Sequence, residues 1–193
     1  MLFRSPTIGM VGIIPDKRKR MSLDFKNAGD AIFMIGTSRD DINSSEYLYS
    51  YCNVKNSPAP FIDLDEELAV QNVVKSLIEE NLIESAHDVS DGGLFITLLE
   101  SAMPKNLGFK IECDEDLRKD AFLFGESQSR VVVSVNAEKL DVFTALLAEM
   151  DVDFMNLGEV TDGAITIDET SFGSTSDYST KYNNAISDLM NQD

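Results

Sequence analysis

The sequence predicts an α+β fold (mixed α/β), with a mixed sheet flanked by helices. Short apolar runs typical of strands alternate along the chain with longer segments whose apolar residues recur at helical spacing. The last two strand-like runs follow one another without a helix between them, which indicates that part of the sheet is antiparallel. The chain contains no complete Rossmann or P-loop glycine pattern.

Composition restricts the classes of partner. The 193 residues include 34 Asp and Glu against 16 Lys and Arg, for a formal charge of −18, so we expect no binding to nucleic acid. No apolar run approaches the roughly 18 residues that a membrane span needs, and we expect no membrane association. Cys52 and Cys113 are isolated, without metal-ligand spacing. Because the first residues also lack the apolar block of a signal peptide, a reduced, cytoplasmic setting is expected.

The first part of the chain predicts three strands and two helices. Residues 7–14 are apolar with two glycines, and residues 31–36 form a continuous apolar run typical of a central strand. The strands are expected at 7–14, 21–25 and 31–36, with helices from Ser44, as the cap, to about Tyr51 and from Asp65 to Asn81, capped by Asp63 or Asp65. Between the first two strands lies the basic run Lys17–Arg20, which is either a solvated loop or a phosphate or partner contact.

The second part predicts further alternation. A buried helix ends near Pro104, because a proline disfavours helical geometry in the residue before it. Residues 154–160 and 164–168 are interpreted as a hairpin across Asp162–Gly163, a favoured tight-turn pair. The remaining elements are a strand at 107–113, a short helix and loop at 114–124, a strand at 131–135, a helix at 137–150 and a closing helix at 182–190.

The segment Ser85–Leu94 predicts a short strand, a polar turn and the start of the buried helix. Asp88 and Asp91 flank the turn, Ser90 or Asp91 is available as the helix cap, and Gly92–Gly93 permits a close approach of backbone or ligand. A helix N-terminus with free N–H groups can bind an anion, whereas the two carboxylates could instead hold a magnesium ion that accompanies phosphates. A capped helix after a tight turn explains the same residues without a ligand. His87, the only histidine, is either a general base or a hydrogen-bonded residue at a strand end.

A second polar group, Glu126, Ser127 and Gln128, precedes the strand at 131–135. A carboxylate, a hydroxyl and an amide at such a position can hold a ribose or phosphate by hydrogen bonds. The alternative is a polar turn before a buried strand. No serine or cysteine has a partner that would predict nucleophilic catalysis, and one histidine with two separate cysteines predicts no zinc site.

A set of short motifs in a fixed order carries a family resemblance. The chain resembles the C-terminal domain of the aminoimidazole-ribonucleotide-synthetase-like superfamily, and most of all the last domain of phosphoribosylformylglycinamidine synthases. This resemblance covers nearly the whole chain and implies a layered α/β/α arrangement. Its motifs are PTIGMVG at 6–12, AGD at 28–30, SEYL at 45–48, AHDVSDGGL at 86–94 and LFGESQSR at 123–130.

The resemblance implies a part in an ATP-dependent ligase of purine biosynthesis. The family enzyme converts formylglycinamide ribonucleotide, with glutamine-derived ammonia, to formylglycinamidine ribonucleotide. ATP and Mg²⁺ serve the full enzyme, and neither is firmly expected on this domain alone. The implied partners are the N-terminal-type synthetase domains of the same full-length chain, a glutaminase subunit and a small accessory subunit. Alternatives are a relative of the aminoimidazole ribonucleotide synthetase or selenophosphate synthetase type, and a noncatalytic structural or assembly domain.

The resemblance assigns no catalytic residue to this chain, so His87 inherits no catalytic role and the isolated domain is expected to be inactive. Glu126, Ser127 and Gln128 match an element that contacts substrate in the family's first C-terminal domain, although the short tail indicates the second copy. We expect one C-terminal-type domain over 1–193, excised from a larger synthetase, with an ordered core at about 6–168 and a tail at 169–193. Residues 87–93 and 125–130 are predicted to meet at neighbouring strand corners as half of a nucleotide-phosphate cradle.

Overall fold

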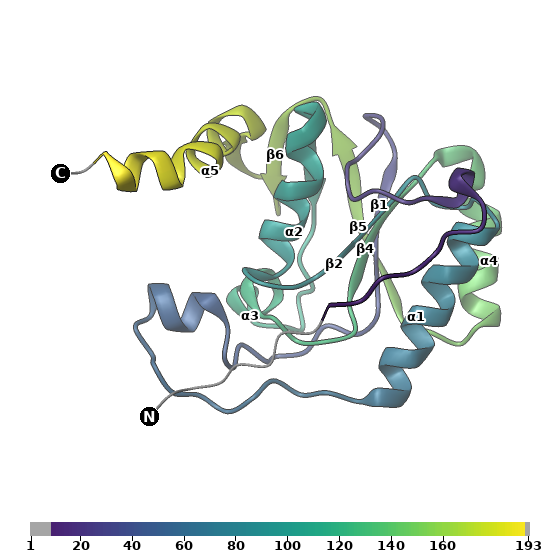
Figure 1. The fold of residues 1–193 in the computed structure, drawn as a ribbon, viewed down its shortest axis with the longest axis horizontal. Coiled ribbons are helices and arrows are strands. Elements are labelled where there is room, and N and C mark those ends of the chain that lie inside the picture. Colours follow the sequence, from purple (N-terminus) through teal and green to yellow (C-terminus); the bar gives the residue numbers. More distant parts are fainter. Residues whose placement is uncertain (1–8, 192–193) are drawn as a thin grey trace.

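A mixed sheet of seven strands runs through the centre of the structure, a computed structural model that describes residues 9–191 (Figure 1). The strand order is β2-β4-β1-β5-β3-β6-β7, and all neighbours are antiparallel except β3 and β6. The predicted fold class is therefore confirmed. The strands are β1 (Ala31–Ile35), β2 (Ser85–Asp88), β3 (Gly108–Ile111), β4 (Val131–Val135), β5 (Phe154–Thr161), β6 (Ala164–Ile167) and β7 (Thr170–Ser174).

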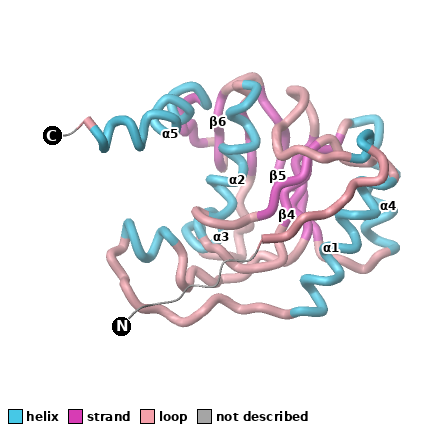
Figure 2. The backbone as a smooth tube through the Cα atoms, in the orientation of Figure 1, coloured by secondary structure: helices cyan, strands magenta, loops and turns pink. Residues whose placement is uncertain are grey.

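Helices cover both faces of the sheet, as the tube in Figure 2 also shows. Helices α1 and α4 pack on one face, and α2 and α3 pack on the other. Helix α5 follows β7, and its second half extends away from the body (Figure 1). No helix within residues 9–191 has the length and apolar character to cross a bilayer. The helices are α1 (Leu64–Glu79), α2 (Gly93–Ala102), α3 (Lys119–Phe124), α4 (Leu140–Glu149) and α5 (Thr175–Met190), with short turns at Lys17–Lys19, Tyr47–Tyr51, Met103–Lys105 and Ala137–Lys139.

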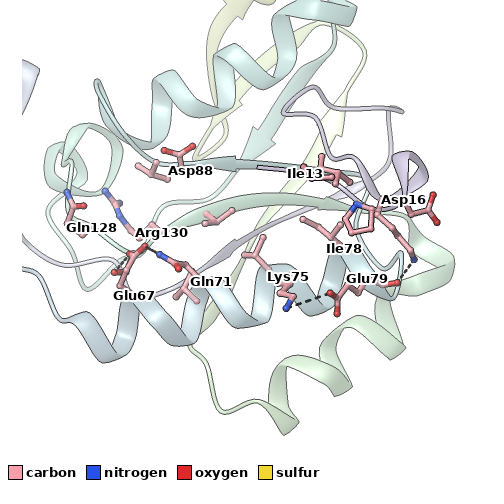
Figure 3. Close-up of a pocket in the computed structure, with 18 residues that line it drawn as sticks. Ile13, Asp16, Glu67, Gln71, Lys75, Ile78, Glu79, Asp88, Gln128 and Arg130 are labelled. Carbon is pink, nitrogen blue, oxygen red and sulfur yellow. Dashed lines mark hydrogen bonds and ion pairs between the residues drawn. The ribbon is translucent and has the colours of Figure 1, made fainter. Parts of the chain in front are cut away.

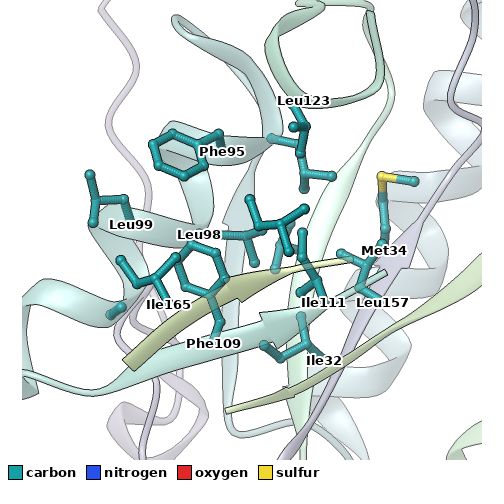
Figure 4. Packing of buried hydrophobic residues seen from close by; sticks show 14 of the residues in the cluster. Ile32, Met34, Phe95, Leu98, Leu99, Phe109, Ile111, Leu123, Leu157 and Ile165 are labelled. Carbon is teal, nitrogen blue, oxygen red and sulfur yellow. The ribbon is translucent and has the colours of Figure 1, made fainter. Parts of the chain in front are cut away.

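The alternation of side chains along β1 explains its continuous apolar sequence. Ile32 and Met34 point into the core beneath α2, where they join Phe109 (Figure 4). Phe33 and Ile35 point to the opposite face and pack with α1 and α4. A strand that is buried on both faces needs apolar residues at every position, which is the pattern that predicted it as central.

The hairpin predicted across Asp162–Gly163 is wrong. Strand β3 lies between β5 and β6, pairing antiparallel with β5 and parallel with β6. Gly108 makes this possible, because a β-carbon there would collide with the Ala164 carbonyl group. The hairpin that does form joins β6 to β7, a strand that we had not predicted, through Asp168 and Glu169, which both have positive φ.

The two strands predicted before residue 26 are also wrong where the structure describes them. Residues 9–14 form no strand, and Met10, Val11 and Ile13 are each more than 90% exposed. Residues 7 and 8 of that prediction lie outside the described residues. The segment 21–25 forms no ladder either, although Phe25 is fully buried and its N–H donates to the Ser101 carbonyl oxygen. Apolar character alone predicted strands here, but a strand also needs a neighbouring edge.

The helix caps agree with the prediction in one of three places. Asp63, one of the two predicted caps of α1, accepts hydrogen bonds from the N–H groups of Asp65 and Glu66. Ser44 does not cap the next helix, which is a π-helical turn at Tyr47–Tyr51. Neither Ser90 nor Asp91 caps α2, whose N-cap is Gly92 in the left-handed region. The last helix is longer than predicted, since α5 begins at Thr175 rather than at residue 182.

Candidate functional site

The two predicted motifs meet at one corner of the sheet. Strand β2 ends at Asp88, which pairs with Val131 at the start of the antiparallel neighbour β4. The next N–H, of Val89, donates to the Arg130 carbonyl oxygen at 2.9 Å. Residues 87–93 therefore leave the sheet beside the place where residues 125–130 join it, as the sequence predicted.

Glu126 ties this corner together. Its Oε1 accepts hydrogen bonds from the N–H groups of Gly92 and Glu46, each at 2.8 Å. The helix N-terminus that we predicted as an anion site thus already binds a carboxylate of the same chain, which satisfies the Gly92 donor. Gly93 serves packing, since a β-carbon there would lie 2.7 Å from the Gly125 carbonyl oxygen.

Arg130 shapes the 125–130 loop from inside the protein. It is 2% exposed, and its guanidinium donates to the carbonyl oxygens of Gly125 (2.7 Å) and Ser127 (3.2 Å) and to the hydroxyl of Ser38 (3.2 Å). Burial lowers the pKa of Arg130 to about 10, so the side chain stays protonated at neutral pH. The sequence contains one signal of this role: Arg130 is a charged residue placed immediately before the strand-like run 131–135.

The three residues of the Glu-Ser-Gln element have different environments. Glu126 is half-buried in the contacts above, and Ser127 is 1% exposed, with no hydrogen-bond partner for its hydroxyl within the described residues. Gln128 is exposed and lines a groove (Figure 3). Of this element, therefore, only Gln128 is placed to contact a molecule in that groove.

The groove has a volume of about 720 Å³ and lies between α1, the end of β2, the start of β4 and residues 13–16. At one end of the groove Asp88 and Gln128 face Glu67 and Gln71 of α1 (Figure 3). Asp16, Lys75 and Glu79 lie toward the other end. Apolar walls with a few polar groups are typical of small-molecule sites. The apolar lining comes from Ile13, Ile14, Val70, Val74, Ile78 and Val131. Asp91 is exposed and does not line the groove.

His87 belongs to β2, and its imidazole ring makes hydrogen-bonding contacts with α2. Its Nδ1 lies 3.1 Å from the Ser101 hydroxyl and 3.2 Å from the Thr97 carbonyl oxygen, and its Nε2 lies 3.5 Å from a carboxylate oxygen of Glu100. The other carboxylate oxygen of Glu100 accepts from Tyr182 of α5 at 2.7 Å. This network favours the interpretation of His87 as a hydrogen-bonded residue at a strand end, which connects β2 to α2 and, through Glu100, to α5.

The corner contains no metal site built from protein ligands alone within the described residues. Among residues 9–191 no three His, Cys, Asp or Glu side chains come together in a way that could hold a metal ion. Asp88 and Asp91 therefore have no third carboxylate or imidazole ligand within the described chain, and a magnesium ion here would take its remaining ligands from water or phosphate oxygens.

The chain is similar to one family over most of its length. The family described as "AIR synthase related protein, C-terminal domain" matches residues 27–168. Phosphoribosylformylglycinamidine synthase subunit PurL of Caldanaerobacter subterraneus is 39% identical over 167 residues, which are 86% of this chain and 23% of that protein. The PurL subunit of Salinibacter ruber is 41% identical over 174 residues, with the same two shares. The chain thus spans about a quarter of the length of these relatives.

Solved structures share the fold. The PurL structure of T. maritima complexed with FGAR has a TM-score of 0.72 at 17% identity and covers 84% of this chain and 30% of that one. Thiamine-monophosphate kinase from Stenotrophomonas maltophilia has a TM-score of 0.54 at 20% identity, with 78% and 54% covered. At these identities the likeness concerns the fold alone.

Proposed function

The chain belongs to the family of AIR synthase related C-terminal domains, and we propose that it acts as such a domain within a phosphoribosylformylglycinamidine synthase. The observation that carries this proposal is the 39% identity to a PurL subunit over 86% of the chain. That enzyme would join ammonia derived from glutamine to formylglycinamide ribonucleotide at the expense of ATP. Because the chain spans 23% of that relative, the reaction would need N-terminal-type synthetase domains, a glutaminase and a small accessory subunit. We further propose a cytoplasmic setting and an inactive isolated domain.

We propose that the groove forms one wall of the ribonucleotide site. Gln128 and Asp88 would contact the ligand, because both are exposed and line the same end of the groove. Glu126, with Arg130 behind it, would hold the loop that presents Gln128. The remaining predicted site residues, Ser127, Asp91, Gly92 and Gly93, would shape the corner rather than bind.

The residues at the sheet corner around Gly92 and Glu126 do not fit ATP or Mg²⁺ by themselves. The Gly92 N–H that a phosphate would need donates to Glu126, and the described residues hold no cluster of metal ligands. We therefore propose that both cofactors are held mainly by domains outside this chain. The part of this chain would be to bind and orient the substrate.

A chimera tests the proposal. This chain would replace the segment that it matches in the Caldanaerobacter PurL, and ADP release would be measured with formylglycinamide ribonucleotide, ATP and ammonia. We expect an active chimera in which Gln128→Ala lowers kcat/KM for the ribonucleotide about three- to tenfold. A decrease of this size corresponds to the loss of one hydrogen bond to the substrate. Asn72→Ala is the matched control, because Asn72 is an exposed amide outside the groove.

Two results would contradict the proposal. One is a chimera that melts cooperatively like the parent enzyme but shows no turnover. The other is an active chimera in which Gln128→Ala and Asn72→Ala have the same kcat/KM for the ribonucleotide. Thermal midpoints of all variants separate these results from simple misfolding.

A noncatalytic assembly domain is the second candidate, and the occupied Gly92 N–H favours it. If this candidate is right, the chimera remains active while substitutions at Asp88 and Gln128 leave kcat/KM unchanged. Titration of the chain alone with formylglycinamide ribonucleotide adds an independent readout, since the ligand-binding role predicts weak binding that Gln128→Ala reduces. The assembly role predicts no such dependence.

A further inference from the structure

Five of the 16 lysine and arginine side chains of this acidic protein line a second hollow, beside the C-terminal end of α1. The hollow has a volume of about 520 Å³. Glu84 is the one carboxylate among the described residues that line it, and its cationic lining consists of Arg18, Lys19, Arg20, Lys26 and Lys139. In a chain with a formal charge of −18, a hollow lined mainly by cations differs in charge from the protein as a whole.

These cations come from separate parts of the sequence. The basic run Lys17–Arg20 predicted either a solvated loop or a phosphate or partner contact. The fold brings Lys26, which precedes β1, and Lys139, which precedes α4, to the same hollow. Lys105 adjoins them, since its ammonium group donates to the Lys26 carbonyl oxygen at 3.3 Å. This convergence distinguishes the hollow from an isolated basic loop.

Three of the five lining cations have carboxylate partners. Ion pairs join Arg18 to Asp16 at 2.7 Å, Lys26 to Asp24 at 2.8 Å and Lys139 to Glu84 at 2.6 Å.

The other two lining cations have no carboxylate partner within the described residues. Lys19 donates to the Glu79 carbonyl oxygen, which carries no net charge. Arg20 is exposed, and its guanidinium makes no hydrogen bond or ion pair among residues 9–191. The hollow thus retains cationic donors for an external anion.

We propose that this hollow binds a small anion with adjacent phosphate groups, such as a di- or triphosphate. Guanidinium groups match phosphate oxygens with paired hydrogen bonds, and the lysines add point charges around them. A compact anion fits the hollow, whereas a long nucleic acid would also meet the acidic remainder of the surface. Lys19 and Ile78 line both this hollow and the groove, so the two sites adjoin.

Calorimetric titration of the chain with sodium tripolyphosphate at low ionic strength tests the proposal. We expect binding that weakens as salt is added, and Arg20→Ala should raise the Kd about fivefold or more. Arg20→Ala removes no hydrogen bond or ion pair of the side chain among the described residues, so the fold is expected to persist, which a thermal melt would verify. The matched control is Lys181→Ala, an exposed cation on α5 whose loss changes the net charge equally and should leave the Kd within about twofold.

A parallel titration with ATP distinguishes the sources of the phosphates. Equal affinity for ATP and tripolyphosphate, with the same sensitivity to Arg20→Ala, identifies the phosphate chain as the ligand; tighter ATP binding with that sensitivity identifies a nucleotide. Failure of tripolyphosphate to bind, or binding that Arg20→Ala leaves unchanged, overturns the proposal. Binding of polyglutamate without binding of tripolyphosphate also overturns it, in favour of an acidic protein surface.

Discussion

At the scale of single residues, one carboxylate and one guanidinium organise the candidate site. Glu126 joins the start of α2 to the loop before the π-helical turn through two backbone N–H groups. Arg130 joins the two ends of its own loop through carbonyl oxygens. A buried arginine without a carboxylate partner is costly, and its neutral acceptors compensate part of that cost. The shape of the corner therefore depends on polar side chains rather than on apolar packing alone.

Glu126→Ala should destabilise the chain by about 2 kcal/mol, because two N–H groups lose a charged acceptor. Glu126→Gln keeps an acceptor oxygen and should therefore lose less stability than Glu126→Ala. Urea unfolding at pH 7 measures both, with Gln128→Ala as the control, because Gln128 is exposed in the same loop and should change stability by less than about 0.5 kcal/mol. If Glu126→Ala and Gln128→Ala are equally stable, Glu126 does not tie the corner.

At the scale of elements, α1 forms the wall of the groove opposite the two motifs. Its first turn carries Asp65, Glu66 and Glu67, which complement the helix dipole, and its buried face is Val70, Val73 and Leu77. Glu67 accepts a hydrogen bond from the Ser129 hydroxyl at 2.7 Å, which links the start of α1 to the 125–130 loop. A helix whose start is well fixed therefore positions one side of the groove.

Asp63→Ala should cost about 1 kcal/mol of stability, since Asp63 is the residue that accepts the first free N–H groups of α1. Asp65→Ala removes only a favourable dipole interaction and should cost roughly 0.5 kcal/mol. Thermal unfolding of the two variants under identical conditions compares them. A larger loss for Asp65→Ala would mean that the helix begins elsewhere.

At the scale of the whole molecule, the formal charge of −18 is spread over a small protein and produces self-repulsion. Most of the ion pairs among the described residues leave at least one partner exposed, as between Lys75 and Glu79 or Arg118 and Asp120, and such pairs contribute little to stability. Repulsion should therefore dominate the response to salt.

We expect the thermal midpoint to rise when NaCl is increased from about 10 to about 150 mM, because the Debye length falls from about 30 to about 8 Å. The double variant Glu115→Gln/Asp116→Asn should show a smaller rise, since it removes two exposed carboxylates from one turn. Differential scanning calorimetry provides the midpoints. A midpoint that falls with salt would show that attractive pairs outweigh repulsion.

The elements that the sequence predicted well are those in which local pattern and tertiary role coincide. Residues 31–35 are apolar at every position, and residues 131–135 at all but Ser134, because both faces of these strands are buried. Helix α1 shows helical spacing because it buries one face. The family resemblance, carried by ordered motifs, was likewise confirmed. The meeting of residues 87–93 and 125–130 was predictable because each motif borders a strand.

Only the tertiary structure decided what depends on contacts distant in sequence. It inserted β3 between β5 and β6, where Gly108 lets two backbones approach, although the local Asp-Gly signal favoured a hairpin. It also placed Glu126 on the Gly92 N–H and assembled the groove and the basic hollow from separate segments. Hydrophobic period and turn chemistry are properties of neighbouring residues, so the sequence alone determined the central strands and most of the helices. The choice of strand neighbour and of hydrogen-bond partner is a competition across the whole fold, which no local pattern records.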